Sequence, residues 1–296
     1  IVKRLLVLLG LVAAVAAVLS FTARPRTLSP GVLPAHEPDT VNGERIFHAG
    51  GCASCHASGD DALPPLMGGG LAMKSPYGVF HVPNISPDPV HGIGRWSALD
   101  FVNAMKLGTS PEGRHYYPAF PYTSYARMSL EDLVDLKSYL DTLPGVQMAN
   151  QEHGLKFPWN IRAGIGLWKL LNLSAEGVVM NLPDDPAIAR GQYLVEGPGH
   201  CGECHTPRDW MGGLQLERWL AGAPDPEGEG RVPNITPSGL QNWSKGDITY
   251  YLQSGFTPDF DTVGGSMVKV QKNMANLPVE DLKAMAAYLK AIPSLD

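Results

Sequence analysis

Cys52-Ala-Ser-Cys55-His56 and Cys201-Gly-Glu-Cys204-His205 are two copies of one pattern, Cys-x-x-Cys-His, and together they hold all four cysteines of the 296-residue chain. Two thiols one helical turn apart can add to the two vinyl groups of a heme, and the adjacent histidine then faces the iron. A zinc site would need further ligands at metal spacing, and a thioredoxin-type dithiol would need a βαβ context. We therefore predict two covalently attached hemes c. The expected thioether cysteines and proximal histidines are Cys52, Cys55, His56, Cys201, Cys204 and His205.

The composition is that of an ordinary globular protein, with 44% hydrophobic and 18% charged residues. A net charge of −6 argues against nucleic-acid binding, which requires a clustered basic surface to meet the phosphates. The 33 glycines and 26 prolines make up about a fifth of the chain, well above average usage. This composition predicts few strands and many turns around a cofactor.

Landmarks recur in the same order and at nearly constant spacing in the two halves of the chain. Gly43 precedes the first motif as Gly191 precedes the second. The run Val82-Pro-Asn-Ile-Ser-Pro87 returns as Val232-Pro-Asn-Ile-Thr-Pro237. Such an internal repeat indicates a duplication, so we expect two homologous heme domains. Their expected ranges are 40–148 and 186–296.

Each repeat predicts the same helices, and an all-α fold is therefore expected. A first helix leads into the heme motif at about 41–50 and again at about 187–197. Gly43 and Gly191 lie in these helices. Because glycine lacks a Cβ, the last helix of each domain can cross close over the first at this point.

The second and third helices of each repeat have recognisable start signals. A serine followed three residues later by an aspartate is an S-x-x-D capping pattern, and it occurs as Ser97–Asp100 and as Ser244–Asp247. The third helix begins near Ser129 and near Pro278 and carries an apolar stripe at helical spacing. These helices complete the expected core of each domain.

The N-terminus carries Lys3 and Arg4 before an uncharged run from Leu5 to Phe21. This run is at the short end of what crosses a bilayer, and basic residues before it favour a cytoplasmic N-terminus. We expect a transmembrane signal anchor over 1–22, which would hold the protein at the inner membrane of a bacterium with the heme domains in the periplasm. A cleaved signal peptide is the competing interpretation.

The segment 149–185 joins the two repeats and is more apolar than a solvated linker. Its stretch 157–171 includes Trp159 and Trp168 among Leu and Ile residues. Tryptophan concentrates at membrane interfaces, so this stretch either lies at the membrane surface or packs between the domains. The sequence favours neither alternative.

The run Tyr117-Pro-Ala-Phe-Pro-Tyr-Thr-Ser-Tyr-Ala-Arg-Met128, the two Pro-Asn-Ile-[Ser/Thr]-Pro loops and Cys201-Gly-Glu-Cys-His-Thr-Pro-Arg208 resemble the membrane-associated diheme cytochromes c. That family includes relatives of the cytochrome subunits of periplasmic alcohol, gluconate and molybdenum-hydroxylase-type dehydrogenases. The resemblance covers roughly 40–296. It implies two tandem class I-like cytochrome c domains, here with one N-terminal transmembrane helix.

The residue types that follow His205 limit the candidates for the distal ligand of the second heme. No histidine or cysteine follows His205, whereas four methionines do. Met285 lies in the apolar stripe of the last helix and Met211 lies too close to the motif. The family resemblance places the ligand at Met267, and Met274 remains the alternative.

The distal ligand of the first heme is expected to be Met128. Some members of the family carry a methionine where this chain has Phe120, which leaves Met128, directly before the last helix of the repeat. Bis-histidine ligation by a loop histidine is the alternative, and the candidates are His81, His91 and His115. Weaker candidates for contacts with the heme propionates are Asn84, Asn234, Trp96, Trp243, Arg114 and Arg208.

Two hemes with His/Met ligation predict electron transfer and no catalytic residue, because a methionine closes the iron to substrates. The expected donor is a dehydrogenase or a cytochrome bc complex, and the expected acceptor is a soluble cytochrome or a terminal oxidase. The competing class is a diheme enzyme with one open iron, such as a peroxidase or a thiosulfate dehydrogenase. Enzymes of the latter type often use a cysteine ligand, and this chain has no spare cysteine.

Overall fold

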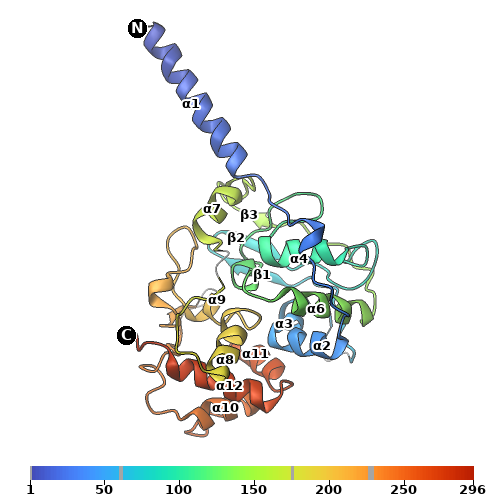
Figure 1. Ribbon diagram of the computed structural model, residues 1–296, viewed down its shortest axis with the longest axis vertical. Coiled ribbons are helices and arrows are strands. Elements are labelled where there is room, and N and C mark those ends of the chain that lie inside the picture. The colour runs from blue at the N-terminus through green and yellow to red at the C-terminus, as the bar shows by residue number, and fades with distance from the viewer. Residues whose placement is uncertain (1, 60–62, 175–176, 226–229) are drawn as a thin grey trace.

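The computed structural model describes residues 2–59, 63–174, 177–225 and 230–296 (Figure 1). Each of the four expected ranges, 1–22, 40–148, 149–185 and 186–296, includes between one and four residues outside this description. Residues 40–148 are called the first repeat below, and residues 186–296 the second repeat.

The two repeats form matching sets of helices (Figure 1). In the first repeat these are α2 (Thr40–Ala49), α3 (Cys52–His56), α4 (Ala98–Leu107), α5 (Tyr122–Tyr125) and α6 (Leu130–Thr142). In the second repeat they are α8 (Pro186–Glu196), α9 (Gly202–His205), α10 (Lys245–Ser254), α11 (Met267–Met274) and α12 (Val279–Ala291). The three helices expected in each repeat are confirmed. The short helices α5 and α11, which precede α6 and α12, were not anticipated.

Both expected capping patterns are present. The hydroxyl of Ser97 accepts from the backbone N–H of Asp100 at 3.1 Å, and the carboxylate of Asp100 accepts from the backbone N–H of Ser97 at 3.0 Å. Ser244 and Asp247 form the same reciprocal pair at the start of α10. Each cap satisfies backbone N–H groups that the first turn of a helix leaves without partners.

The close crossing expected at the two glycines is confirmed. A Cβ added to Gly43 would lie 2.1 Å from the carbonyl oxygen of Asp135 in α6, and one added to Gly191 would lie 1.9 Å from that of Ala284 in α12. Backbone atoms cannot move aside as a flexible side chain can. Only glycine therefore allows the first and last helices of each repeat to pack at this distance.

Gly191→Ala is expected to destabilise the fold by about 1–3 kcal/mol, because the added methyl group overpacks a helix crossing that has no free space. Gly246→Ala is the matched control, since a Cβ there would meet only the Ser244 hydroxyl, at 3.4 Å. Thermal unfolding of the two variants measures the difference. An unchanged melting temperature for Gly191→Ala would show that the α8–α12 crossing can spread at little cost.

The expectation of an all-α fold is wrong, because the described residues also form two small sheets. The antiparallel strands β1 (Ala72–Ser75) and β2 (Gly78–His81) form a hairpin, and β3 (Gly154–Leu155) from the linker adds to it. In the second repeat, β4 (Ala223–Pro224) pairs with β5 (Arg231–Val232). The hairpin turns through Pro76 and Tyr77, and Pro and Gly around a two-residue connection were the available sequence signal.

The expected membrane anchor also requires correction. Helix α1 (Val2–Thr22) projects from the rest of the molecule (Figure 1). Among the residues that the structure describes, no helix combines the length and apolar character needed to cross a membrane. The uncharged run behind Lys3 and Arg4 is shorter than the roughly 20 apolar residues that span a bilayer. The assignment of 1–22 as a transmembrane anchor, and the inner-membrane localisation that followed from it, are therefore wrong.

Trp168 of the linker stretch packs between the repeats, as one of the two alternatives predicted, whereas Phe157 and Leu171 of the same stretch are largely exposed. Trp168, in α7 (Gly164–Asn172), is 7% exposed, and its indole N–H donates to the carbonyl oxygen of Met211 in the second repeat at 3.0 Å. Its ring also lies edge-on to Tyr122 of the first repeat. Trp159 packs against Tyr77. The two tryptophans thus contact protein.

The remaining elements are two short 3-10 helices, η1 (Pro30–Val32) and η2 (Leu216–Arg218). Each repeat builds a hydrophobic core of its own, to which its first, second and last expected helices and the loops between them contribute. Ala49, at the end of α2, belongs to the core of the second repeat. The two repeats therefore meet where the first heme motif begins.

Candidate heme sites

Each heme motif begins after a residue in the left-handed backbone region. Gly51 precedes Cys52 with a φ of 55°, and His200 precedes Cys201 with a φ of 38°. Glycine adopts this conformation freely, whereas a histidine is uncommon there. The Nε2 of His200 lies 3.2 Å from the carbonyl oxygen of Gly50. The residue before the second motif therefore contacts a residue just before the first motif.

The two expected proximal histidines are oriented by the same contact. Nδ1 of His56 donates to the carbonyl oxygen of Pro83, and Nδ1 of His205 donates to that of Pro233, both at 2.8 Å. Because a carbonyl oxygen only accepts, the proton lies on Nδ1 and the Nε2 lone pair remains available for iron. Burial lowers the pKa of both histidines, which favours the neutral imidazole. These donor sets fit a heme iron.

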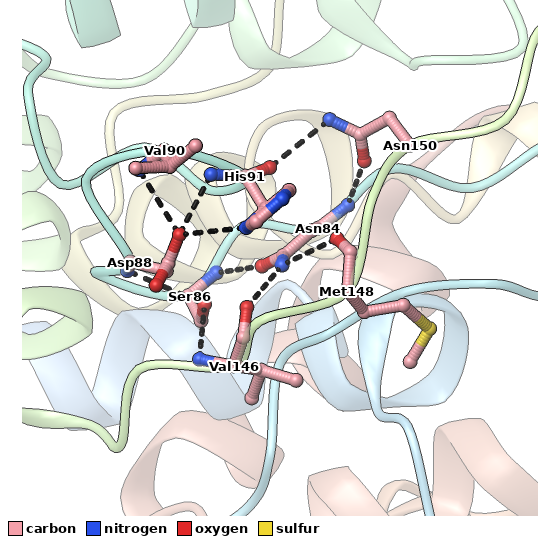
Figure 2. A network of polar contacts seen from close by, with 8 residues as sticks. All are labelled: Asn84, Ser86, Asp88, Val90, His91, Val146, Met148 and Asn150. Atoms are coloured by element: carbon pink, nitrogen blue, oxygen red, sulfur yellow. Dashed lines mark hydrogen bonds and ion pairs between the residues drawn. The ribbon is translucent and has the colours of Figure 1, made fainter.

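The loop that supplies the Pro83 carbonyl is fixed by Asn84 (Figure 2). The Asn84 amide donates to the carbonyl oxygens of Val146 at 2.7 Å and Met148 at 3.0 Å, and its backbone N–H donates to Asn150. In the second repeat, the amide of Asn234 donates to the carbonyl oxygen of Leu295 at 2.6 Å. Both asparagines therefore position the loop behind a proximal histidine.

The same loop is stabilised further along by Asp88 (Figure 2). Its carboxylate accepts from the backbone N–H groups of Val90 at 3.0 Å and His91 at 2.7 Å, and it lies 3.3 Å from Nδ1 of His91. The Ser86 hydroxyl accepts from the backbone N–H of Val146 at 2.9 Å. His91 is thus part of a loop network, and bis-histidine ligation remains the alternative for the first heme.

The cysteine environments fit thioether attachment. Cys52 and Cys201 are half-buried, and burial, with a smaller contribution from the second cysteine of each motif, raises the pKa of both thiols to about 12. A redox dithiol needs the opposite shift, because the thiolate is the reactive form. The dithiol alternative therefore loses support.

Met128 lies in the core of the first repeat, with an exposed fraction of 2%. It lines a small cavity together with Cys52 and Tyr125. Nζ of Lys106, in α4, donates to the carbonyl oxygens of Met128 and Ala126, both at 2.6 Å. The structure thus brings Met128 beside an attachment cysteine and anchors its backbone. Its role as a ligand remains a prediction.

Met267 and Met274 lie at the two ends of α11. Met267 is half-buried and packs against the second core, as Cys201 does, whereas Met274 is 2% exposed and belongs to that core. The deep burial of Met274 is typical of a core methionine. The structure therefore keeps Met267 as the expected ligand and Met274 as the alternative.

The two heme motifs contact each other's repeat through equivalent residues. Ser54, between the cysteines of the first motif, accepts from the amide of Asn273 in α11 at 2.9 Å. Glu203, at the same place in the second motif, accepts from the hydroxyls of Thr123 and Ser124 in α5, both at 2.8 Å. Ser124 and Asn273 are equivalent positions of the two repeats. The interface therefore has an approximate two-fold symmetry around the motifs.

A second pair of equivalent contacts joins the helices of the two repeats. Asp281 of α12 accepts from Arg45 of the first repeat at 2.5 Å and from Arg190 of its own repeat at 2.9 Å. Its counterpart Asp132 accepts from Tyr193, which occupies the position of Arg45 in the second repeat. These residues were not identified from the sequence, although the repeat alignment places an aspartate at both positions.

The other residues suggested for the propionates have protein partners. Arg114 is largely exposed and lies 3.8 Å from Glu112. Arg208 forms an ion pair with Glu203, and Trp243 packs edge-on against Tyr251. Burial alone favours the neutral form of Glu203, but the charge of Arg208 and the hydroxyl donors outweigh it, so the pKa of Glu203 lies below its ordinary value.

Two Cys-x-x-Cys-His turns with oriented histidines and nearby methionines define a c-type cytochrome with two heme sites. Comparison with known proteins agrees. The cytochrome c family model matches residues 40–144. A diheme cytochrome c-type protein of Cereibacter sphaeroides is 52% identical over 279 residues, which cover 92% of each chain.

Two further relatives are subunits of larger enzymes. The cytochrome c subunit of a quinone alcohol dehydrogenase of Gluconobacter oxydans is 34% identical over 290 residues, covering 90% of this chain and 58% of the relative. The cytochrome c subunit of gluconate 2-dehydrogenase of Pantoea cypripedii is 34% identical over 275 residues, covering 88% of this chain and 61% of the relative. The chain thus spans about three fifths of these two subunits.

The chain belongs to the diheme c-type cytochromes, and it carries two covalently bound hemes c. The resemblance inferred from the motifs is confirmed. Sequence reasoning missed the carbonyl groups of Pro83 and Pro233, although the repeated Val-Pro-Asn-Ile run was a visible signal for them. It also missed Glu203 and Lys106, whose partners lie far away in the sequence.

Proposed function

We propose that this chain is an electron-transfer protein that accepts electrons from a dehydrogenase and delivers them, by way of both hemes, to a soluble cytochrome or a terminal oxidase. The proposal of a dehydrogenase donor rests on the relatives, two of which are cytochrome subunits of dehydrogenases. No bond-making step is assigned to the chain itself.

The observation that carries the proposal is the interface at which each heme motif contacts the other repeat. His200 reaches Gly50, and Ser54 and Glu203 each reach the other repeat. Electron transfer through protein slows steeply with distance, so adjoining motifs support passage of an electron from one heme to the other. An arrangement for separate chemistry at two independent irons would not need this interface.

Each heme supplies a one-electron Fe(III)/Fe(II) couple when bound. The residues of the chain hold it in place for that purpose. The Pro83 and Pro233 carbonyls keep the proximal imidazoles in one tautomer, which fixes the ring that faces the iron. Met128 and Met267, as proposed sixth ligands, would exclude water and substrates.

The proposal is tested by isolating the full chain under mild conditions together with its bound partners. Ethanol, fructose and gluconate are then added one at a time under exclusion of oxygen. We expect one of these, or another dehydrogenase substrate, to reduce both hemes per chain, as followed by the α-band of ferrous heme c. Turnover of hydrogen peroxide or thiosulfate by the purified chain alone would contradict the proposal and favour an enzyme with an open iron.

A further inference from the structure

The two heme motifs differ in charge at one equivalent position. Glu203 lies between the cysteines of the second motif, and Ser54 lies at the same place in the first. Both side chains are directed to the interface between the repeats, where each contacts the other repeat. The second motif therefore holds an acidic group at a position that is neutral in the first.

The carboxylate of Glu203 is built into the fold. One oxygen accepts from the hydroxyls of Thr123 and Ser124, both at 2.8 Å, and the other accepts from Nη2 of Arg208 at 2.5 Å. The Glu203 side chain is 9% exposed and that of Arg208 is 35% exposed. With three donors and no nearby carboxylate among these contacts, the group is arranged to stay ionised.

Arg208 is itself held in place by backbone groups. Its Nη1 donates to the carbonyl oxygen of Gly212 at 2.8 Å, and its Nη2 also donates to that of Glu203 at 3.1 Å. The positive charge is consequently fixed near the motif and is more exposed to solvent than the negative charge. Solvent screens an exposed charge more than a buried one. The net effect of the pair on a nearby heme is therefore that of a partly compensated negative charge.

A fixed negative charge close to a heme stabilises the ferric form, which carries one more positive charge than the ferrous form. We propose that the Glu203–Arg208 pair lowers the reduction potential of the second heme relative to the first, and so sets the potential difference between them. The inference requires only that each motif holds a heme. It does not depend on the identity of the donor or acceptor.

Potentiometric titration of the full diheme chain tests this inference. Glu203→Gln leaves Arg208 as an uncompensated positive charge, so one of the two titration waves is expected to move to a more positive potential, by more than the other wave moves. Arg208→Gln leaves Glu203 uncompensated, so the same wave is expected to move to a more negative potential. Arg208→Lys keeps the charge and is expected to stay close to the unmodified protein.

A variant at Ser54, the position equivalent to Glu203, shows which titration wave belongs to which heme. Ser54→Asp places an acidic group in the first motif and is expected to lower the other wave. Shifts of Glu203→Gln and Arg208→Gln in the same direction, or equal shifts of both waves, would overturn the proposal, because a structural disturbance would then be sufficient to explain them. If Glu203→Gln fails to fold, the comparison of Arg208→Gln with Arg208→Lys decides the question.

Discussion

Asp281→Asn is expected to lower the free energy of unfolding by about 3 kcal/mol, at the lower end of the 3–5 kcal/mol typical of a buried ion pair that loses one partner. The Asp281 side chain is 2% exposed, whereas those of Arg45 and Arg190 are 35% and 30% exposed. Partial solvation of the two guanidinium groups reduces the loss. The effect remains large because one carboxylate serves an arginine from each repeat.

The contribution of Asp281 depends on pH in a defined direction. Burial opposes ionisation, but hydrogen bonds from Arg45 and Arg190 outweigh it and hold the pKa of Asp281 below its ordinary value of 3.8. A carboxyl group with a lowered folded-state pKa stabilises the fold above its unfolded-state pKa. That stabilisation is lost as the pH falls through the folded-state value. Asp281→Asn should lack this part of the acid dependence.

Urea unfolding of the heme-loaded chain at neutral and acidic pH measures both effects. Glu280→Gln is the matched control, because Glu280 precedes Asp281 in the same helix but is 72% exposed and pairs with the exposed Lys283. An exposed pair of this kind contributes little, about 0–1 kcal/mol. Equal stability of the two variants would contradict the assignment of Asp281 as the centre of the interface between the repeats.

Met267→Ala and Met128→Ala are each expected to open one heme and leave the other unchanged. Thioether ligation favours ferrous iron, so loss of the methionine should lower the potential of the affected heme. The near-infrared methionine-to-iron band should lose about half of its intensity in each variant. The spectrum of each oxidised variant is compared with that of the oxidised unmodified protein, in which both hemes are expected to be low-spin.

The two expected ligands occupy different positions of the repeat. The position of Met128 is taken by Leu277 in the second repeat, directly before α12. Met267 instead begins α11, the helix that leads to that position. Met274→Leu therefore serves as the control for the second heme, and it should keep the band. Loss of the band in Met274→Leu but not in Met267→Ala would transfer the ligand to Met274.

The bis-histidine alternative for the first heme has its own test. His115 is 6% exposed, and its Nε2 lies 2.8 Å from the carbonyl oxygen of Ala23. This contact gives the ring a role in holding the segment that follows α1. His115→Ala is therefore expected to leave the spectrum of the first heme unchanged. A changed spectrum, together with no change in Met128→Ala, would favour His115 as the ligand.

The heme motifs, the repeat and the main helices could be predicted because each is a local pattern. A Cys-x-x-Cys-His run, a serine with an aspartate three residues later, and a glycine at a helix crossing are visible within a few residues. The β1–β2 hairpin had a local signal that was overlooked, whereas β3 comes from the linker and pairs with that hairpin more than 70 residues earlier. Such pairing depends on tertiary structure, which a local pattern does not contain.

The prediction of a membrane anchor also rested on a local pattern, and this pattern fits more than one kind of segment. An uncharged run after two basic residues is shared by several kinds of segment, and its length decides between them. The interface around Asp281 and Glu203 was missed because its partners lie far apart in the sequence. Equivalent positions in the two repeats differ there, as Arg45 and Tyr193 do, so the repeat alignment alone gave no sign of a contact.

Carbon monoxide binding to the fully reduced, unmodified chain tests the central claim most directly, because a carrier with two His/Met hemes has no open iron. The chain as isolated, with both hemes attached, is titrated with carbon monoxide and followed in the Soret region. We expect little or no binding at either heme. Saturable binding at one heme per chain would show an open iron and contradict the account of a pure electron carrier.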